Sequence, residues 1–182
     1  MLMKKVTLII LMLCSMVISA QEINWMTFEE AVEAQKKEPR KIMVDAYTTW
    51  CGPCKLLDKN TFSNRDVADY LNKNYYAVKF NAEGNEKVNF KEYTFTNPNF
   101  DPTRKGRNSQ HQLASYFGVR AFPTLLFLDE VSNFLLPIPG YKTPQQLEIY
   151  LKLFGSDDYK NITSKEAWQE YSSNFKYEFM SN

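Results

Sequence analysis

The sequence predicts an α/β domain with a central mixed β-sheet and helices on both of its faces. Segments with helical spacing of apolar residues alternate along the chain with short runs of β-branched and aromatic residues. Two of those runs, 124–128 and 133–138, are joined by a connection short enough for a hairpin, which makes the sheet mixed. At 182 residues the chain can bury one good core, so we expect one domain.

Residues 1–20 have the composition of a secretory signal peptide. Two lysines precede a mostly apolar stretch, and a small residue, Ala20, stands where a signal peptidase would cut. The apolar stretch is shorter than the roughly 20 residues that a membrane-spanning helix needs, which disfavours a retained anchor. A lipid on Cys14 is also disfavoured, because this cysteine lies inside the apolar stretch. We therefore predict a periplasmic or otherwise exported protein, with cleavage near Ala20.

The charge of the chain excludes some kinds of partner. Its 22 basic and 21 acidic residues nearly balance, and they form no basic cluster and no long charge run. This pattern argues against a nucleic-acid partner and against a charged membrane surface. No apolar heptad stripe suggests an obligate partner, so we expect a monomer.

The first elements are a helix, a strand and a second helix. Thr27 and Glu30 form a capping box that predicts a helix over 28–37. The run 42–47 is short, apolar and bounded by turn residues, which predicts a buried central strand. Helical spacing then extends over 51–61, so the first cysteine of this segment lies at a strand-to-helix junction.

A helix near 65–72 and a strand over 76–81 are followed by a surplus of residues. About twice as many residues separate this strand from the next one as a helix with two loops requires. The surplus falls near 89–108, which is aromatic, rich in turn residues and weakly periodic. We interpret it as an insertion beside the fold, and we expect the next helix over 109–117, ended by Gly118.

The domain is expected to span 21–155. Its two hairpin strands are followed by Thr143, which predicts a capped helix over 144–154 that ends at a glycine. The remaining segment, 156–182, is predicted to be a C-terminal helical extension, with an amphipathic helix near 165–175.

The string Trp50-Cys51-Gly52-Pro53-Cys54-Lys55 carries the chemistry of the chain. Once the predicted signal peptide is removed, its two cysteines are the only ones left. A disulfide between them would close a very small loop and stabilise the fold little, which favours a reactive pair over a structural one. A dithiol at this spacing can exchange two electrons with the disulfide of another protein.

A metal site is the competing interpretation of the two cysteines. Zinc usually requires four ligands, and only His111 could join Cys51 and Cys54. We expect His111 to be a surface residue near the start of a helix. No metal is therefore predicted.

The residues at 50–55 resemble the active site of the thioredoxin family, and the central string of that family is intact there. Asp45, six residues before Cys51, matches the buried acid of that family, and Lys79 matches the lysine near that acid. The resemblance implies a thioredoxin fold in which Cys51 is the nucleophile and Cys54 resolves the mixed disulfide. It also implies that Asp45 relays a proton and that Lys79 tunes this acid.

The same resemblance implies a docking edge for client proteins. The pair Phe122-Pro123 matches the cis-proline loop of the family, whose backbone would receive an extended peptide. Gly140 matches a glycine that helps to line the substrate groove. The substrate-binding residues implied in this way are Trp50, Gly52, Pro53, Phe122, Pro123 and Gly140.

The resemblance implies a protein-disulfide reductase that uses its own redox-active disulfide and no dissociable cofactor. The pair Gly52-Pro53 is that of the reducing members, rather than the histidine-containing pair typical of the oxidants and isomerases. The expected partners are disulfide-containing proteins and a membrane-embedded thiol reductant, because an exported dithiol has no reliable soluble electron source. The alternatives are a reductant dedicated to one client, for example in cytochrome c maturation, a disulfide isomerase or oxidant, and a redox-inactive binding module.

Overall fold

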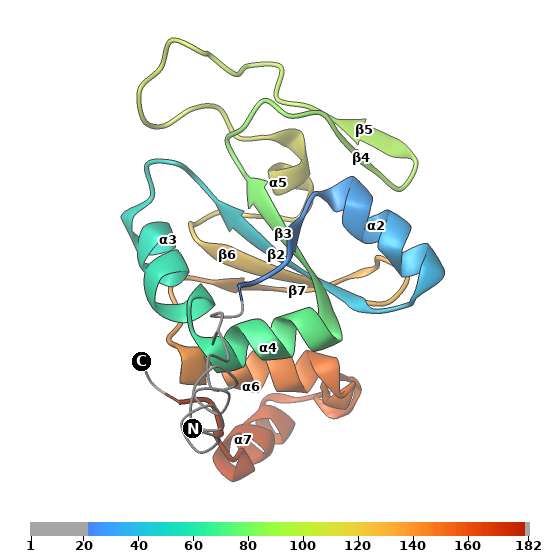
Figure 1. The fold of residues 1–182 in the computed structure, drawn as a ribbon. Helices are drawn as coiled ribbons and strands as arrows, with labels where there is room; N and C mark the ends of the chain where they lie inside the picture. Colours follow the sequence, from blue (N-terminus) through green and yellow to red (C-terminus); the bar gives the residue numbers. More distant parts are fainter. Residues whose placement is uncertain (1–21, 181–182) are drawn as a thin grey trace, which may run out of the picture.

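A five-stranded mixed sheet forms the centre of the fold (Figure 1). The computed structural model describes residues 22–180, so the predicted signal peptide lies outside the described residues. In spatial order the strands are β1 (Trp25–Met26), β3 (Tyr75–Asn81), β2 (Lys41–Tyr47), β6 (Thr124–Leu128) and β7 (Phe134–Pro139). The first three run parallel, whereas β6 and β7 are each antiparallel to their neighbours. The predicted mixed sheet is confirmed, and β2, which leads to the dithiol, is its central strand.

Helices cover both faces of the sheet, as predicted (Figure 1). One face carries α2 (Phe28–Lys37) and α5 (Gln112–Tyr116). The other face carries α3 (Gly52–Leu57), the wider π-type turn η1 (Asp58–Phe62), α4 (Arg65–Asn74) and α6 (Pro144–Gly155). Neighbouring residues of β2 point into opposite cores, Met43 toward α4 and α6 and Val44 toward α2 and α5. Within residues 22–180, no helix combines the length and apolar character needed to cross a bilayer.

Two capping boxes begin helices where the sequence predicts them. The Thr27 hydroxyl accepts a hydrogen bond from the backbone N–H of Glu30 at 3.2 Å, and the Glu30 carboxylate accepts one from the Thr27 N–H at 2.8 Å. Thr143 and Gln146 make the same reciprocal pair at the start of α6. These bonds satisfy N–H groups that the first turn of a helix leaves unpaired.

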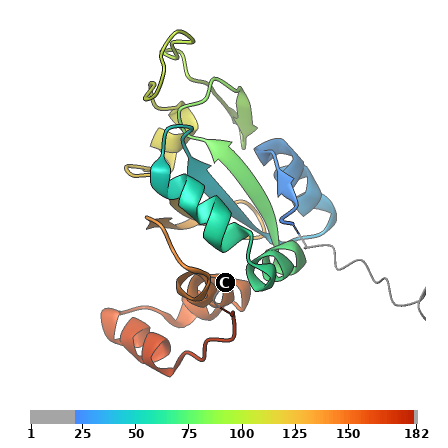
Figure 2. The same cartoon turned by 60° about the vertical axis from the view of Figure 1, so that its left-hand side comes forward.

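The predicted insertion begins with regular structure that its weak periodicity does not reveal. Here β4 (Val88–Phe90) and β5 (Tyr93–Phe95) form a separate antiparallel hairpin. Phe90 is buried, and its ring centroid lies 5.7 Å from that of Phe28 in α2, so the hairpin extends the core on this face. The following segment, 96–111, is a long loop at the same end of the sheet as the β2–α3 connection (Figures 1 and 2).

His111 is buried, so the expectation of a surface histidine is wrong. Its Nδ1 accepts a hydrogen bond from the N–H of Leu113 at 3.1 Å, and its Nε2 lies 2.8 Å from the carbonyl oxygen of Glu86. The imidazole caps α5, which therefore begins at Gln112 rather than near residue 109. Small polar residues dominate this cap position, so a histidine is not expected there from the sequence.

The C-terminal extension folds back onto α4 and α6. It contains the short 3₁₀ turn η2 (Asp158–Asn161) and α7 (Lys165–Asn174), and it ends with Phe179 buried in the core. The Glu148 carboxylate of α6 accepts hydrogen bonds from the backbone N–H groups of Glu178 and Phe179 at 2.8 and 2.9 Å. Lys152 lies 2.7 Å from the same carboxylate, so the buried charge is compensated.

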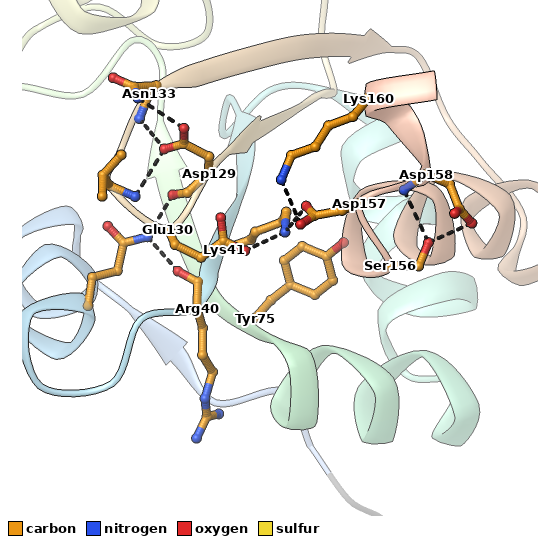
Figure 3. Close-up of polar contacts among 12 residues, drawn as sticks. Arg40, Lys41, Tyr75, Asp129, Glu130, Asn133, Ser156, Asp157, Asp158 and Lys160 are labelled. Atoms are coloured by element: carbon orange, nitrogen blue, oxygen red, sulfur yellow. Dashed lines mark hydrogen bonds and ion pairs between the residues drawn. The ribbon is translucent and has the colours of Figure 1, made fainter. Parts of the chain in front are cut away.

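A buried lysine ties the far end of β2 to the turns around it (Figure 3). Lys41 is 4% exposed and pairs with Glu130 at 2.5 Å and with Asp157 at 2.7 Å. Beside it, the side-chain amide of Gln35 donates a hydrogen bond to the carbonyl oxygen of Asp129 at 2.9 Å. These contacts join α2, β2, the β6–β7 turn and the end of α6, and they lie at the end of β2 opposite the dithiol.

Candidate functional site

The dithiol lies where the central strand β2 turns into α3. Cys51 is the N-cap residue of α3, and Cys54 lies in its first turn. The two sulfur atoms form a disulfide, and each cysteine is only 2% exposed. The Cys54 backbone N–H donates a hydrogen bond to the Cys51 sulfur at 3.1 Å. This N–H and the positive end of the helix dipole both favour a thiolate on Cys51 once the pair is reduced.

The two residues between the cysteines are exposed and belong to the first turn of α3. Pro53 occupies a position where the missing N–H of proline costs no helical hydrogen bond. A Cβ atom added to Gly52 would meet nothing within 4 Å. The space in front of this turn is therefore open, while the sulfur atoms themselves are recessed.

A buried acid in β2 is paired with a lysine of the neighbouring strand. Asp45 is fully buried, and its Oδ2 lies 2.7 Å from Lys79 Nζ. The two residues stand opposite each other in the parallel pairing of β2 with β3, so the sheet register brings them together. In the part of the chain that the structure describes, Asp45 Oδ1 has no hydrogen-bond partner. That oxygen is available to hold a proton.

Burial dominates the protonation of this acid. It raises the pKa of Asp45 from 3.8 to about 6, although the positive charge of Lys79 opposes the change. Burial also acts to lower the pKa of Lys79, but its contacts with Asp45 and Asp58 outweigh this and raise it overall. The lysine therefore stays cationic, and the carboxyl can both give and take a proton near neutral pH.

Sequence reasoning missed the second acidic partner of Lys79. Asp58, in η1, also pairs with this ammonium, which therefore links the strands to the helix that carries the dithiol. The ammonium nitrogen lies over the rings of Trp25 and Tyr47, 4.8 and 5.2 Å from their centroids. Asp58 follows Cys54 by four residues, a spacing that puts two residues on one face of a helix. This spacing could have placed Asp58 on the side of the helix that carries Cys54, although not its contact with Lys79.

The residues expected to dock a client lie on two neighbouring turns. The Phe122–Pro123 peptide bond is cis, and the Pro123 carbonyl oxygen accepts a hydrogen bond from the Gly140 N–H at 2.8 Å. Gly140 has φ of 83°, a conformation that favours glycine. The Phe122 ring meets the Trp50 ring edge to face, with centroids 6.0 Å apart. The cis-proline loop and the dithiol turn are thus in direct contact.

Two further residues contact Trp50, and sequence reasoning missed both. The Glu83 carboxylate accepts hydrogen bonds from the Trp50 indole N–H at 2.6 Å and from the Asn108 backbone N–H at 2.8 Å. The Arg107 guanidinium carbon lies over the Trp50 ring, 4.4 Å from its centroid. The end of the inserted segment is therefore attached to the dithiol turn. No local spacing signals these contacts, because the residues meet only in the folded chain.

The arrangement is suited to thiol chemistry. A dithiol at a helix start, a buried acid with a pKa near neutrality and an aromatic contact between Trp50 and Phe122 belong to neighbouring elements at one end of the sheet. Among residues 22–180, no group of three or more His, Cys, Asp or Glu side chains could hold a metal ion. The chemistry that the described residues support is exchange between a dithiol and a disulfide.

Comparison with known proteins points to the same chemistry. A family model described as a thioredoxin-like domain matches residues 28–155. The thiol:disulfide interchange protein DsbD of Pseudoalteromonas atlantica is 26% identical over 56% of this chain, and that of Actinobacillus pleuropneumoniae is 28% identical over 62%. This chain spans only 14% and 17% of the lengths of these two proteins. A solution structure from Bacteroides thetaiotaomicron, provisionally named a disulphide isomerase, is 30% identical, with a TM-score of 0.52 over 76% of this chain and 97% of that one.

Proposed function

Because the chain belongs to the thioredoxin-like family, we propose that it reduces the disulfides of other proteins through Cys51 and Cys54. Proteins of this family work through a redox-active disulfide and need no dissociable cofactor. The observation that carries the proposal is the intact cysteine pair at the start of α3, in contact with an aromatic docking edge through Trp50. The pair Gly52-Pro53 between the cysteines supports the reducing direction.

The proposed reaction has two exchange steps. The Cys51 thiolate attacks one sulfur of the client disulfide, which forms a mixed disulfide and releases the other client sulfur as a thiolate. The Cys54 thiolate then attacks the Cys51 sulfur and displaces the second client sulfur. The client leaves as a dithiol, and a disulfide now joins Cys51 and Cys54. Two electrons have then passed to the client. The position of Cys51 at the helix N-cap supports this order of attack.

Asp45 is the proposed proton acceptor for the second step. The Cys54 thiol must lose its proton before it can attack, and a buried carboxylate with a pKa of about 6 can accept one near neutral pH. The strand that holds Asp45 runs directly into the dithiol turn, and its Oδ1 has no partner within the described residues. Lys79 would limit the cost of the buried negative charge during this transfer.

The docking edge would hold an extended segment of the client. We assign this role to the loop of Phe122 and Pro123, because the Phe122 ring contacts Trp50 beside the nucleophile. Gly140 lies against the same loop through its hydrogen bond to the Pro123 carbonyl oxygen. An extended peptide that pairs with a loop backbone gains its affinity there from main-chain hydrogen bonds, so this edge can accept clients of different sequence.

We also propose that the protein acts after export, as a monomer. Residues 1–20 have the composition of a signal peptide, and an exported dithiol requires a membrane-embedded thiol reductant to restore it. The similarity to two proteins named as thiol:disulfide interchange proteins supports a place in such an electron relay. N-terminal sequencing of the protein from an exported fraction should start at Gln21. A chain that retains Met1 and stays inside the cell would contradict this proposal.

Insulin reduction tests the proposed activity. With dithiothreitol as the electron source, the mature protein should accelerate the precipitation of insulin B chain, and Cys51→Ser should not exceed the rate of dithiothreitol alone. Equal rates for the two proteins would overturn the proposal. The midpoint potential then tests the direction, because a value near about −270 mV supports a reductase and one near about −120 mV indicates an oxidant.

A further inference from the structure

We propose that Arg107 selects clients that carry a carboxylate next to the disulfide to be reduced, an inference that rests on the proposed exchange function. The guanidinium carbon of Arg107 lies 4.4 Å from the centroid of the Trp50 ring, and Trp50 directly precedes Cys51. The inserted segment therefore places a positive charge beside the nucleophile that every client must approach.

The backbone next to Arg107 is held in place by its neighbours. The N–H of Asn108 donates a hydrogen bond to the Glu83 carboxylate at 2.8 Å, and the same oxygen accepts the Trp50 indole N–H at 2.6 Å. The Asn108 side chain also closes the loop, through hydrogen bonds of 3.0 and 2.8 Å with the backbone N–H and C=O of Asp101. Arg107 is therefore presented from a fixed loop, which a selecting residue requires.

The base of the same loop is closed by a second asparagine. The Asn97 side-chain amide donates hydrogen bonds to the carbonyl oxygens of Gly84 and Ser109 at 2.9 and 2.7 Å. The Ser109 hydroxyl donates a further hydrogen bond to the Asn97 side chain at 2.7 Å. Both ends of the loop are thus attached to the segment after β3, which also supplies Glu83.

The charge of Arg107 is free for a partner. Within residues 22–180, no carboxylate lies at ion-pair distance from its guanidinium, whereas Arg104 of the same loop pairs with Asp101 at 3.6 Å. The Glu83 carboxylate accepts the hydrogen bond of the Trp50 indole N–H and forms no ion pair with Arg107 among the described residues. A guanidinium that lies over an aromatic ring keeps the N–H groups at its edge, which can bind a carboxylate in a bidentate fashion.

Two other exposed charges near the dithiol have the same sign as Arg107. Lys55 of α3 and Arg120, just before the cis-proline loop, are exposed and have no ion-pair partner in the described part of the chain. Of the acids near the site, Asp45 and Asp58 both pair with Lys79, and Glu83 accepts hydrogen bonds from Trp50 and Asn108. An acidic client therefore meets attractive charge as it approaches the nucleophile.

Single-turnover reduction of two matched peptides tests the proposal. Each peptide has one intramolecular disulfide, and the two peptides differ only in the two residues beside the first cysteine. Both of these residues are Glu in one peptide and Gln in the other. Pre-reduced protein supplies the two electrons, and the second-order rate constants are compared. The wild-type protein should reduce the Glu peptide about two- to fivefold faster at low salt, the range expected for one exposed ion pair. The preference should shrink at about 1 M salt, where the Debye length falls to about 3 Å.

Variants of the loop separate selection from structure, because the measured quantity is the ratio of two rates. Arg107→Gln should lower the ratio toward one, with Lys55 and Arg120 accounting for any preference that remains, and Arg107→Lys should keep more of the preference. Arg104→Gln removes the same charge from the same loop and should leave the ratio unchanged. A wild-type ratio of one, an unchanged ratio in Arg107→Gln, or an equal drop in Arg104→Gln would overturn the role of Arg107. Wild-type protein that reduces neither peptide would instead overturn the proposed function itself.

Discussion

Replacement of Asp45 by Asn should stabilise the oxidised protein at neutral pH, because the native carboxylate is buried at a cost. Burial raises the pKa of Asp45 from 3.8 to about 6, and Lys79 offsets only part of this effect. One pKa unit corresponds to about 1.4 kcal/mol, so ionisation of Asp45 lowers the free energy of unfolding by about 3 kcal/mol above pH 6. Asn resembles the protonated acid in shape and carries no charge. Asp45→Asn should therefore recover most of this free energy.

The sign of the pH dependence follows from the two pKa values. Between pH 3.8 and about 6 the folded chain holds a proton on Asp45 that the unfolded chain has released. The contribution of Asp45 to stability therefore falls as the pH rises through this window. Below pH 3.8 the acid is protonated in both states, and the two proteins should be almost equally stable. The advantage of Asp45→Asn should grow from near zero at about pH 3.5 to about 3 kcal/mol at about pH 7.

Urea denaturation at several pH values measures this difference. Wild type and Asp45→Asn are compared with the disulfide intact, and the pH dependence common to both proteins cancels in the difference. Glu33→Gln is a matched control, because this carboxylate pairs with Lys36 on the surface of α2 and is 57% exposed. The control should show little change with pH. An Asp45→Asn protein that is less stable than wild type near pH 7, or a difference independent of pH, would refute the reasoning.

Three other substitutions have defined outcomes. Lys79→Met should raise the pKa of Asp45 further and shift the pH profile of insulin reduction upward, because the acid loses its cationic partner; an unshifted profile would count against this pairing. Lys41→Ala should lower the free energy of unfolding by about 1–3 kcal/mol in urea, since its two carboxylate partners are partly exposed and can turn to water. Phe179→Ala should cost about 3–5 kcal/mol by leaving a cavity under the C-terminal segment, and a loss below about 0.5 kcal/mol would show that this segment does not support the core.

The main fold could be predicted because its signals are local in the chain. The capping box at Thr27 and Glu30 specifies the start of α2 within four residues, and the apolar run of β2 specifies a buried strand by itself. The pairing of Asp45 with Lys79 was expected from the family resemblance. The parallel register of β2 and β3 gives that contact its physical reason.

The features that could not be predicted depend on residues far apart in the chain. The strands of the β4–β5 hairpin are too short to show alternation, and Phe90 becomes buried only because α2 offers the Phe28 ring. The buried imidazole of His111 is satisfied only in the folded chain, where the carbonyl oxygen of Glu86 accepts a hydrogen bond from its Nε2–H. The contact of Arg107 with the dithiol turn likewise exists only after the loop has folded.

Trapping the reaction intermediate tests the central claim, that Cys51 attacks and Cys54 resolves. Pre-reduced Cys54→Ser and Cys51→Ser proteins are mixed with the same disulfide peptide, and the adducts are located by mass spectrometry of proteolytic fragments. We predict a stable mixed disulfide on Cys51 in the first protein and almost none in the second, while wild type releases one reduced peptide per chain. A Cys51→Ser protein that forms its adduct on Cys54 as fast as Cys54→Ser forms one on Cys51 would contradict the account.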